Sequence, residues 1–241
     1  LIPSIQKSFL SKDVDAMRKT PKLALAYLGI GEAETYRGYW KKEWDTEADG
    51  KPDKGAPEWL GPVNPDWPGN YKVRYWDPAW QEIVFACLDK IQEAGFDGVY
   101  LDIIDAFEFW ADRKTAERDM VDFVLAIAAR ARKKAPAFGV FPQNGDALAK
   151  HADYVKAVTG IGSEDLFYDG DKKRSAVETK EAVANLEVFR KAGKLVLVTD
   201  YVTRRKEVDD FYARAKEKGF VPYATVRALD RLTIAEGHEP E

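Results

Sequence analysis

The segment Gly95–Asp105 (GFDGVYLDIID) limits the fold most, because it has the pattern of a buried strand that ends in two carboxylates, Asp102 and Asp105. Its apolar residues favour strand, and two glycines mark the point where the chain enters it. Helical patterns precede and follow it. A buried strand between helices indicates a parallel sheet, and catalytic groups gather at the carboxyl ends of such strands. We therefore expect the two carboxylates to serve more than packing.

The composition fits a globular domain with a full core. The chain has 241 residues, of which 45% are hydrophobic and 32% charged. A net charge of −4 implies no surface for nucleic acid. No run approaches the roughly 18 apolar residues of a membrane span. The single cysteine, Cys87, lies in an apolar helical pattern and is expected to be a buried thiol. The composition makes no prediction of the oligomeric state.

Strand and helix patterns alternate along the whole chain. Strands are expected at 22–30, 98–104, 138–142, 157–161, 195–199 and 221–226. Helices are expected from Asp77 to Gly95 and at 114–133, 175–191 and 206–218, with a short helix after Asn144. A (β/α)8 TIM barrel needs eight strands, whereas an open doubly wound sheet can use six. No glycine fingerprint for a dinucleotide or phosphate follows any strand, which favours the barrel.

We therefore expect one TIM-barrel domain over residues 1–241. Six strands leave the barrel incomplete, so its first one or two strands are expected to lie before Leu1 or near it. Leu1–Ile5 has the pattern of a strand remnant. Ser11–Arg18 has the pattern of the helix that follows, with Ser11 as its cap.

An aromatic segment at about 31–76 separates the first strand from the next helix. It is too long for an ordinary connection between a strand and a helix, and long loops at this end of a barrel are usually functional. All seven tryptophans of the chain lie between Trp40 and Trp110. Aromatic rings at a barrel mouth suit sugar rings. The alternative is a satellite core beneath a long loop.

Polar groups follow nearly every expected strand, and Tyr27 is placed to point inward from the first. These groups are Glu32 and Glu34, Asp102 and Asp105, Gln143 and Asn144, Ser163 to Asp165, Asp200 and Tyr201, and Arg227 and Asp230. A single member of this set can be a helix cap or a solvated carboxylate. As a set, they predict a polar pocket at one face of the domain.

The residue types at this face point to acid–base chemistry by carboxylates. The only histidines, His151 and His238, do not end strands, which argues against a histidine metal site or a histidine-containing triad. A site for Mg²⁺ or Ca²⁺ made of carboxylates alone stays open. Two carboxylates without a metal are the equipment of glycoside hydrolysis. Asp102 and Glu164 end strands two positions apart in the expected barrel, so we expect them to face one sugar.

Long stretches of the chain resemble glycoside hydrolase family 114, the endo-α-1,4-polygalactosaminidase-like family. The stretches are AYLGIGEAETYRGYW, APEWLG, NPDWPGNYKVRYWDPAWQ, GFDGVYLDIIDAFEF, FPQNG and GIGSEDLFY. The resemblance covers about Leu23 to Leu232. It implies a TIM barrel whose first strands precede the AYLGIGEAE segment. It also implies a polysaccharide substrate, no cofactor, and an extracellular or periplasmic location.

The resemblance also implies residue roles. Asp102 matches the nucleophile and Glu164 the general acid/base. Asp102 is preferred to Asp105 because a residue at the end of a strand is held more rigidly than one in a loop. The expected sugar contacts are Tyr27, Glu32, Glu34, Trp40, Asp105, Gln143, Asn144, Asp200 and Tyr201.

The leading hypothesis is a retaining endo-glycosidase that cleaves an α-linked, galactosamine-rich polysaccharide. The alternative is a non-catalytic glycan-binding protein of the same fold. A nucleotide-dependent enzyme and a metal-dependent carboxylate hydrolase are two further hypotheses. The first of these lacks a phosphate-binding loop in the sequence, and chelator sensitivity would test the second.

Overall fold

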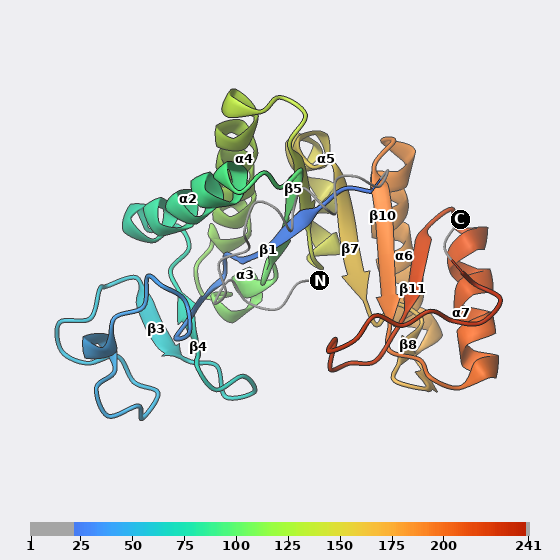
Figure 1. The fold of residues 1–241 in the computed structure, drawn as a ribbon, viewed down its shortest axis with the longest axis horizontal. Coiled ribbons are helices and arrows are strands. Elements are labelled where there is room, and N and C mark those ends of the chain that lie inside the picture. Colours follow the sequence, from blue (N-terminus) through green and yellow to red (C-terminus); the bar gives the residue numbers. More distant parts are fainter. Residues whose placement is uncertain (1–21, 240–241) are drawn as a thin grey trace. The chain divides into compact units, whose positions relative to one another are not determined.

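The computed structural model describes residues 22–239 (Figure 1). These residues form two compact units, one ending at Val140 and the other beginning at Phe141. The predicted strand remnant Leu1–Ile5 and helix Ser11–Arg18 lie outside the described residues. None of the helices between residues 22 and 239 is both long enough and apolar enough to cross a lipid bilayer.

The first unit contains a sheet of short buried strands in the order β1-β5-β6. These are β1 (Leu25–Gly29), β5 (Gly98–Asp102) and β6 (Gly139–Pro142), which runs across the boundary between the units. The first two pair in parallel, with Tyr27 opposite Tyr100 and Gly29 opposite Asp102. All three lie within the predicted strands. The pairing brings the end of β1 beside the candidate carboxylate on β5.

Helix α2 (Pro78–Glu93) begins and ends where its sequence predicts. The carboxylate of Asp77 accepts a hydrogen bond from the backbone N–H of Ala79 at 2.8 Å, and proline occupies the first helical position. The positive φ of Gly95 (87°) ends the segment. The apolar face packs against β1 and β5 and against α4 (Ala116–Lys134). A short helix, α3 (Ala106–Phe109), lies between β5 and α4.

The aromatic segment after β1 is a small folded insertion, and its prediction as a loop was wrong. It contains an antiparallel sheet in the order β2-β4-β3 and a single 3-10 turn, η1 (Lys42–Trp44). Its strands are β2 (Glu32–Glu34), β3 (Leu60–Val63) and β4 (Asn70–Val73). Strands this short, one of them containing proline, give no alternating pattern to detect.

Many rings of the insertion form a core of their own, as the alternative interpretation predicted. Trp59 packs edge-to-face on Trp44 and in a tilted arrangement on Trp80, with ring centroids 5.2 Å and 4.9 Å apart, and Tyr75 is fully buried. The indole N–H of Trp80 donates to the carbonyl of Ile30 at 2.8 Å, which ties this core to the end of β1. Burial of rings of this size contributes several kcal/mol, so the insertion is held firmly.

The second unit contains a parallel sheet in the order β11-β10-β7. Its strands are β7 (Gly160–Glu164), β10 (Leu195–Asp200) and β11 (Val221–Ala224). The other elements are η2 (Asp146–Lys150), α5 (Ala152–Ala157), α6 (Ala176–Lys191), α7 (Arg205–Glu217) and the hairpin of β8 (Tyr168–Asp169) with β9 (Lys172–Lys173).

The strand predicted at 157–161 lies three residues further on, at 160–164. The β-branched residues Val158 and Thr159 favour strand, so the sequence placed the strand too near the N-terminus. The glycines of β7 have low strand propensity, so its true position gave a weak signal. Position 160 has no room for a side chain, since a Cβ at Gly160 would lie 2.7 Å from the carbonyl oxygen of Leu195. The shift makes Glu164 the last residue of the strand rather than part of the loop.

Gly31 is a close-contact glycine next to the candidate site, and it generates the first prediction. A Cβ at Gly31 would lie 2.2 Å from the carbonyl oxygen of Ile103 and 2.6 Å from the Cβ of Ala106. We expect Gly31→Ala to lower the free energy of unfolding by about 1–3 kcal/mol through overpacking. Thermal and urea denaturation will measure the change.

Gly38 supplies the matched control, because a Cβ there meets no atom within 4 Å. We expect Gly38→Ala to change the stability by no more than about 0.5 kcal/mol. Equal stability of the two alanine variants would contradict the close approach described for Gly31.

Candidate functional site

Asp102 is held at the end of β5 by a tyrosine on the neighbouring strand. The hydroxyl of Tyr27 donates to its Oδ2 at 2.6 Å. Burial, and then the negative charges of Asp102 and Glu34, raise the pKa of Tyr27 well above its usual value. The phenol therefore stays protonated and acts as a permanent donor. This contact orients the carboxylate and stabilises its ionised form.

The backbone turns sharply directly after Asp102. Ile103 has φ of 62°, a left-handed conformation that is unfavourable for a β-branched residue. The backbone N–H of Ile30 donates to the carbonyl of Asp102 at 3.0 Å, which fixes the start of the turn. Strain of this kind costs on the order of 1–3 kcal/mol and clusters at functional sites. Asp105 lies beyond the turn, is exposed, and occupies the position before α3.

The acids of β2 are buried and engaged by partners within the insertion. Both oxygens of Glu34 are engaged, Oε2 by the Nε–H of Arg37 at 2.5 Å and Oε1 by the hydroxyl of Tyr36. Glu32, 1% exposed, accepts from Lys72 at 2.6 Å. It also accepts from the side-chain amides of Asn64 and Asn70. These contacts give Glu32 and Glu34 a structural role. Their role in sugar binding stays a prediction.

Glu164 is the centre of a second cluster, in the second unit. Its Oε1 accepts a hydrogen bond from the hydroxyl of Tyr201, and its backbone N–H donates to Oδ1 of Asn144 at 3.0 Å. The Asn144 amide lies 3.5 Å from Oε2 of Glu164. Burial, and then the hydrogen bond to Glu164 and the charge of that residue, raise the pKa of Tyr201 well above its usual value. The structure thus brings together three predicted site residues from three separate segments.

Asp200 fixes the loop that leaves Glu164. Its side chain is fully buried and accepts from the backbone N–H groups of Leu166, Phe167 and Tyr168 at 2.7, 3.0 and 3.0 Å. Burial raises the pKa of Asp200 to about 6, while the three N–H donors act in the opposite direction. At neutral pH it is therefore an ionised anchor for this loop, and its predicted sugar contact stays a prediction.

Arg227 forms an ion pair with Asp165, the residue that follows Glu164. Its guanidinium binds both oxygens of Asp165, at 3.0 and 2.9 Å, and lies 4.4 Å from the ring centroid of Tyr201. Burial raises the pKa of Asp165, and the pairing with Arg227 opposes that rise. Arg227 thus contacts both Asp165, which follows Glu164 in the chain, and Tyr201, which donates to the Glu164 carboxylate. Asp165 is accordingly a structural partner. Among residues 22–239, the donors to the carboxylate of Glu164 are the uncharged groups of Tyr201 and Asn144.

At three strand ends, the residue that follows the candidate side chain has a positive φ. Among residues 22–239, five non-glycine residues have positive φ, and three of them directly follow a candidate side chain. Ile103 follows Asp102, Asn144 follows Gln143, and Asp165 follows Glu164. Each of the three candidates is thereby placed immediately before an abrupt change in chain direction. Such positions are held by the surrounding structure rather than by local preference.

Several supporting residues were not predicted from the sequence. Arg37 and Lys72 neutralise the buried acids of β2, and Asn64 and Asn70 complete the shell around Glu32. The register of β2 against β4, with Glu32 opposite Lys72, is the signal that would have identified that pair. Among the described residues, no group of three or more His, Cys, Asp or Glu side chains is arranged to hold a metal ion.

The anchor role of Asp200 yields the second prediction. In Asp200→Asn an NH₂ group faces backbone N–H donors, and at least one donor loses its acceptor in a buried position. We expect a loss of about 2–4 kcal/mol in the free energy of unfolding at pH 8. The control is Asp169→Asn, which removes an exposed carboxylate of the same region and should cost less than about 1 kcal/mol. Equal melting temperatures for the two variants would contradict this role.

Solved structures of carbohydrate-active enzymes share the fold. The glycoside hydrolase domain of PelA from Pseudomonas aeruginosa superposes with a TM-score of 0.71 at 20% identity, covering 94% of this chain and 87% of that one. Aspergillus fumigatus Ega3, solved in complex with galactosamine, gives a TM-score of 0.68 at 17% identity, covering 91% and 81%. The likeness shows that the chain has the TIM-barrel fold of glycoside hydrolases, as its strand–helix alternation predicted.

Sequence comparison is more specific than the shared fold. An uncharacterized protein of Methanocaldococcus jannaschii is 39% identical over 241 residues, which cover 93% of this chain and 67% of that protein. The family model for glycoside-hydrolase family GH114 matches residues 5–239. The chain therefore belongs to glycoside-hydrolase family GH114.

Proposed function

We propose that the chain is an endo-acting glycosidase that cleaves α-linked, galactosamine-rich polysaccharide, with Asp102 as nucleophile and Glu164 as general acid/base. The observation that carries the proposal is a repeated arrangement. Each acid is the last residue of a parallel strand, and each accepts a hydrogen bond from a tyrosine supplied by the neighbouring strand or the residue after it. Carboxylates fixed at strand ends of this fold are the usual place for its chemistry.

The proposed reaction is retaining and proceeds in two steps. In the first, an oxygen of Asp102 attacks the anomeric carbon while Glu164 protonates the glycosidic oxygen, which leaves with that proton. In the second, Glu164 removes a proton from water, and the water oxygen displaces Asp102 from the sugar. Each acid accepts a hydrogen bond from a tyrosine hydroxyl, which holds its carboxylate in place for these steps.

The choice of an amino sugar has two supports. Ega3, which shares the fold, was solved with galactosamine. The net charge of this chain is −4, and a polymer that carries free amines is a polycation, so the charges are complementary. A polysaccharide of this kind is met outside the cytoplasm, and we propose an extracellular or periplasmic location for the enzyme.

The third prediction tests the two acids directly. We expect Asp102→Asn and Glu164→Gln each to reduce cleavage of deacetylated galactosaminan by at least about 10³-fold, because each removes a group that forms or breaks bonds in the transition state. Reducing-end release measures cleavage, and circular dichroism with thermal denaturation measures the fold.

Matched exposed residues provide the controls for that prediction. Asp112→Asn and Glu181→Gln make the same chemical changes at exposed positions and should leave the rate within about twofold of the unchanged protein. Undiminished cleavage in either site variant would overturn the assignment. If the unchanged protein binds galactosaminan but cleaves neither its acetylated nor its deacetylated form, the chain is a non-catalytic glycan-binding protein.

The fourth prediction tests the two tyrosines that hold the proposed acids. Tyr27→Phe and Tyr201→Phe each remove a hydroxyl that donates to Asp102 or Glu164 and keep the aromatic ring. Each carboxylate then loses a contact that fixes its orientation for bond making and breaking. We expect kcat/KM for the cleavage of galactosaminan to fall by about 10- to 100-fold in each variant.

Tyr223→Phe is the control, because its hydroxyl accepts from the backbone of Thr233 and contacts neither acid. It should leave kcat/KM within about twofold of the value for the unchanged protein. Undiminished cleavage in Tyr27→Phe and Tyr201→Phe would contradict the role of the two hydroxyls in holding the acids.

A further inference from the structure

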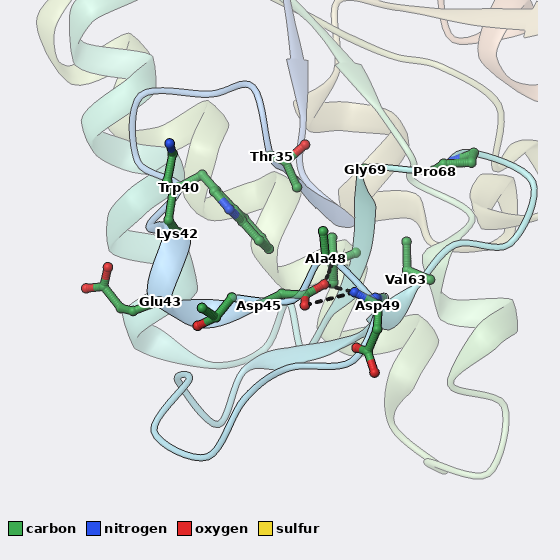
Figure 2. A pocket seen from close by; sticks show the side chains of 13 residues that line it. Thr35, Trp40, Lys42, Glu43, Asp45, Ala48, Asp49, Val63, Pro68 and Gly69 are labelled. Carbon is green, nitrogen blue, oxygen red and sulfur yellow. Dashed lines mark hydrogen bonds between the residues drawn. The ribbon is translucent and has the colours of Figure 1, made fainter.

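The insertion after β1 contains a pocket with a volume of about 770 Å³ (Figure 2). This size lies within the range of about 300–1,000 Å³ that is typical of small-molecule sites. Its walls come entirely from residues 35–71, which include η1, the loop that follows it and the ends of β3 and β4. The pocket is therefore a feature of the insertion itself.

One wall of the pocket is aromatic and rigid. Trp40 is half-buried, and Figure 2 shows its indole lying among the other lining side chains. The ring packs at 4.7 Å on Tyr71 and edge-to-face at 5.3 Å on Trp44, so it is held from the protein side. A fixed, partly open indole suits the C–H face of a sugar ring. It also attracts a cation through its π-electrons.

The charges on the walls favour a cation. The charged lining residues are Lys42, Glu43, Asp45 and Asp49, which together carry three carboxylates and one ammonium group. Asp45 is buried, and its oxygens accept from the hydroxyl of Tyr71 and from the backbone N–H groups of Gly50 and Asp49 at 2.9 and 3.1 Å. The hydrogen bond from Tyr71 lowers the pKa of Asp45. It is therefore a fixed negative charge behind the pocket.

From the cavity, the aromatic wall and these charges we propose that the Trp40 pocket binds a galactosamine unit, that is, a hexosamine with a free ammonium group. The inference rests on the proposed function, because it takes its ligand from the polymer that the enzyme is proposed to cleave. The pyranose stacks on Trp40, its ammonium group lies toward Asp49, and the hydroxyls of Thr35 and Thr46 remain for the sugar hydroxyls.

The fifth prediction is a titration of the ¹⁵N-labelled unchanged protein with galactosamine hydrochloride, followed through the indole N–H signals in NMR. The monosaccharide has no glycosidic bond, so the measurement does not depend on cleavage. Trp40→Phe identifies the Trp40 signal by its loss. We expect this signal to shift in a saturable manner with galactosamine, and at least about tenfold more weakly with N-acetylgalactosamine, which lacks the charge. The exposed Trp67 of the same insertion is an internal reference that should not move.

A pair of charge variants tests the proposed position of the ammonium group. Asp49→Asn should weaken galactosamine binding several-fold and reduce its dependence on salt. Asp66→Asn removes an exposed carboxylate of the same insertion that does not line the pocket, and should change neither property. Equal effects of the two variants would overturn the proposed position of the ammonium group.

The outcomes separate this inference from the proposed function. Cleavage of galactosaminan with an unmoved Trp40 signal overturns the pocket and leaves the enzyme. A shifted Trp40 signal in a protein that cleaves no galactosaminan supports the pocket and overturns the enzyme. Equal shifts with the charged and the acetylated sugar overturn the proposed ligand class.

Discussion

The register of β1 against β5 is the constraint on which the first cluster depends. It sets Gly29 opposite Asp102 and Tyr27 opposite Tyr100, so the phenol of Tyr27 reaches two residue pairs forward to the carboxylate. A slip of one residue would turn Tyr27 to the other face of the sheet and leave the buried phenol without this acceptor. The same pairing brings Gly31 against the carbonyl of Ile103, where no side chain fits. One register therefore fixes the strand end, its donor and the turn that follows.

The second cluster reaches a similar result by different means. Asp200, at the end of β10, gathers three backbone N–H groups from the loop after β7, while Arg227 binds the carboxylate of Asp165. Both contacts act on the residues that follow Glu164 and neither touches its side chain. The carboxylate of Glu164 is left to the uncharged donors Tyr201 and Asn144. Charged contacts thus fix the loop that follows Glu164, and neutral donors hold the carboxylate that is proposed to exchange a proton.

The sequence predicted the elements that have strong local signals. The cap at Asp77, the glycines after the helices and the apolar run of β5 each carry their own information, and those elements lie where they were expected. The errors occurred where structure depends on distant partners. Strand β7 is rich in glycine and is defined by its pairing with β10, and the strands of the insertion are defined by one another.

The candidate site divides in the same way. Asp102, Glu164 and their neighbours were found because polar groups after buried strands form a local pattern. Which of these groups are engaged by the protein itself was not visible in that pattern. The burial of Glu32 and Glu34 depends on Lys72 and Arg37, and Lys72 is brought close only by the antiparallel pairing of β2 with β4. The sequence alone therefore does not tell whether an acid after a strand is free for chemistry or is paired with a lysine or arginine elsewhere in the chain. Asp165 illustrates this, because its partner Arg227 lies 62 residues away.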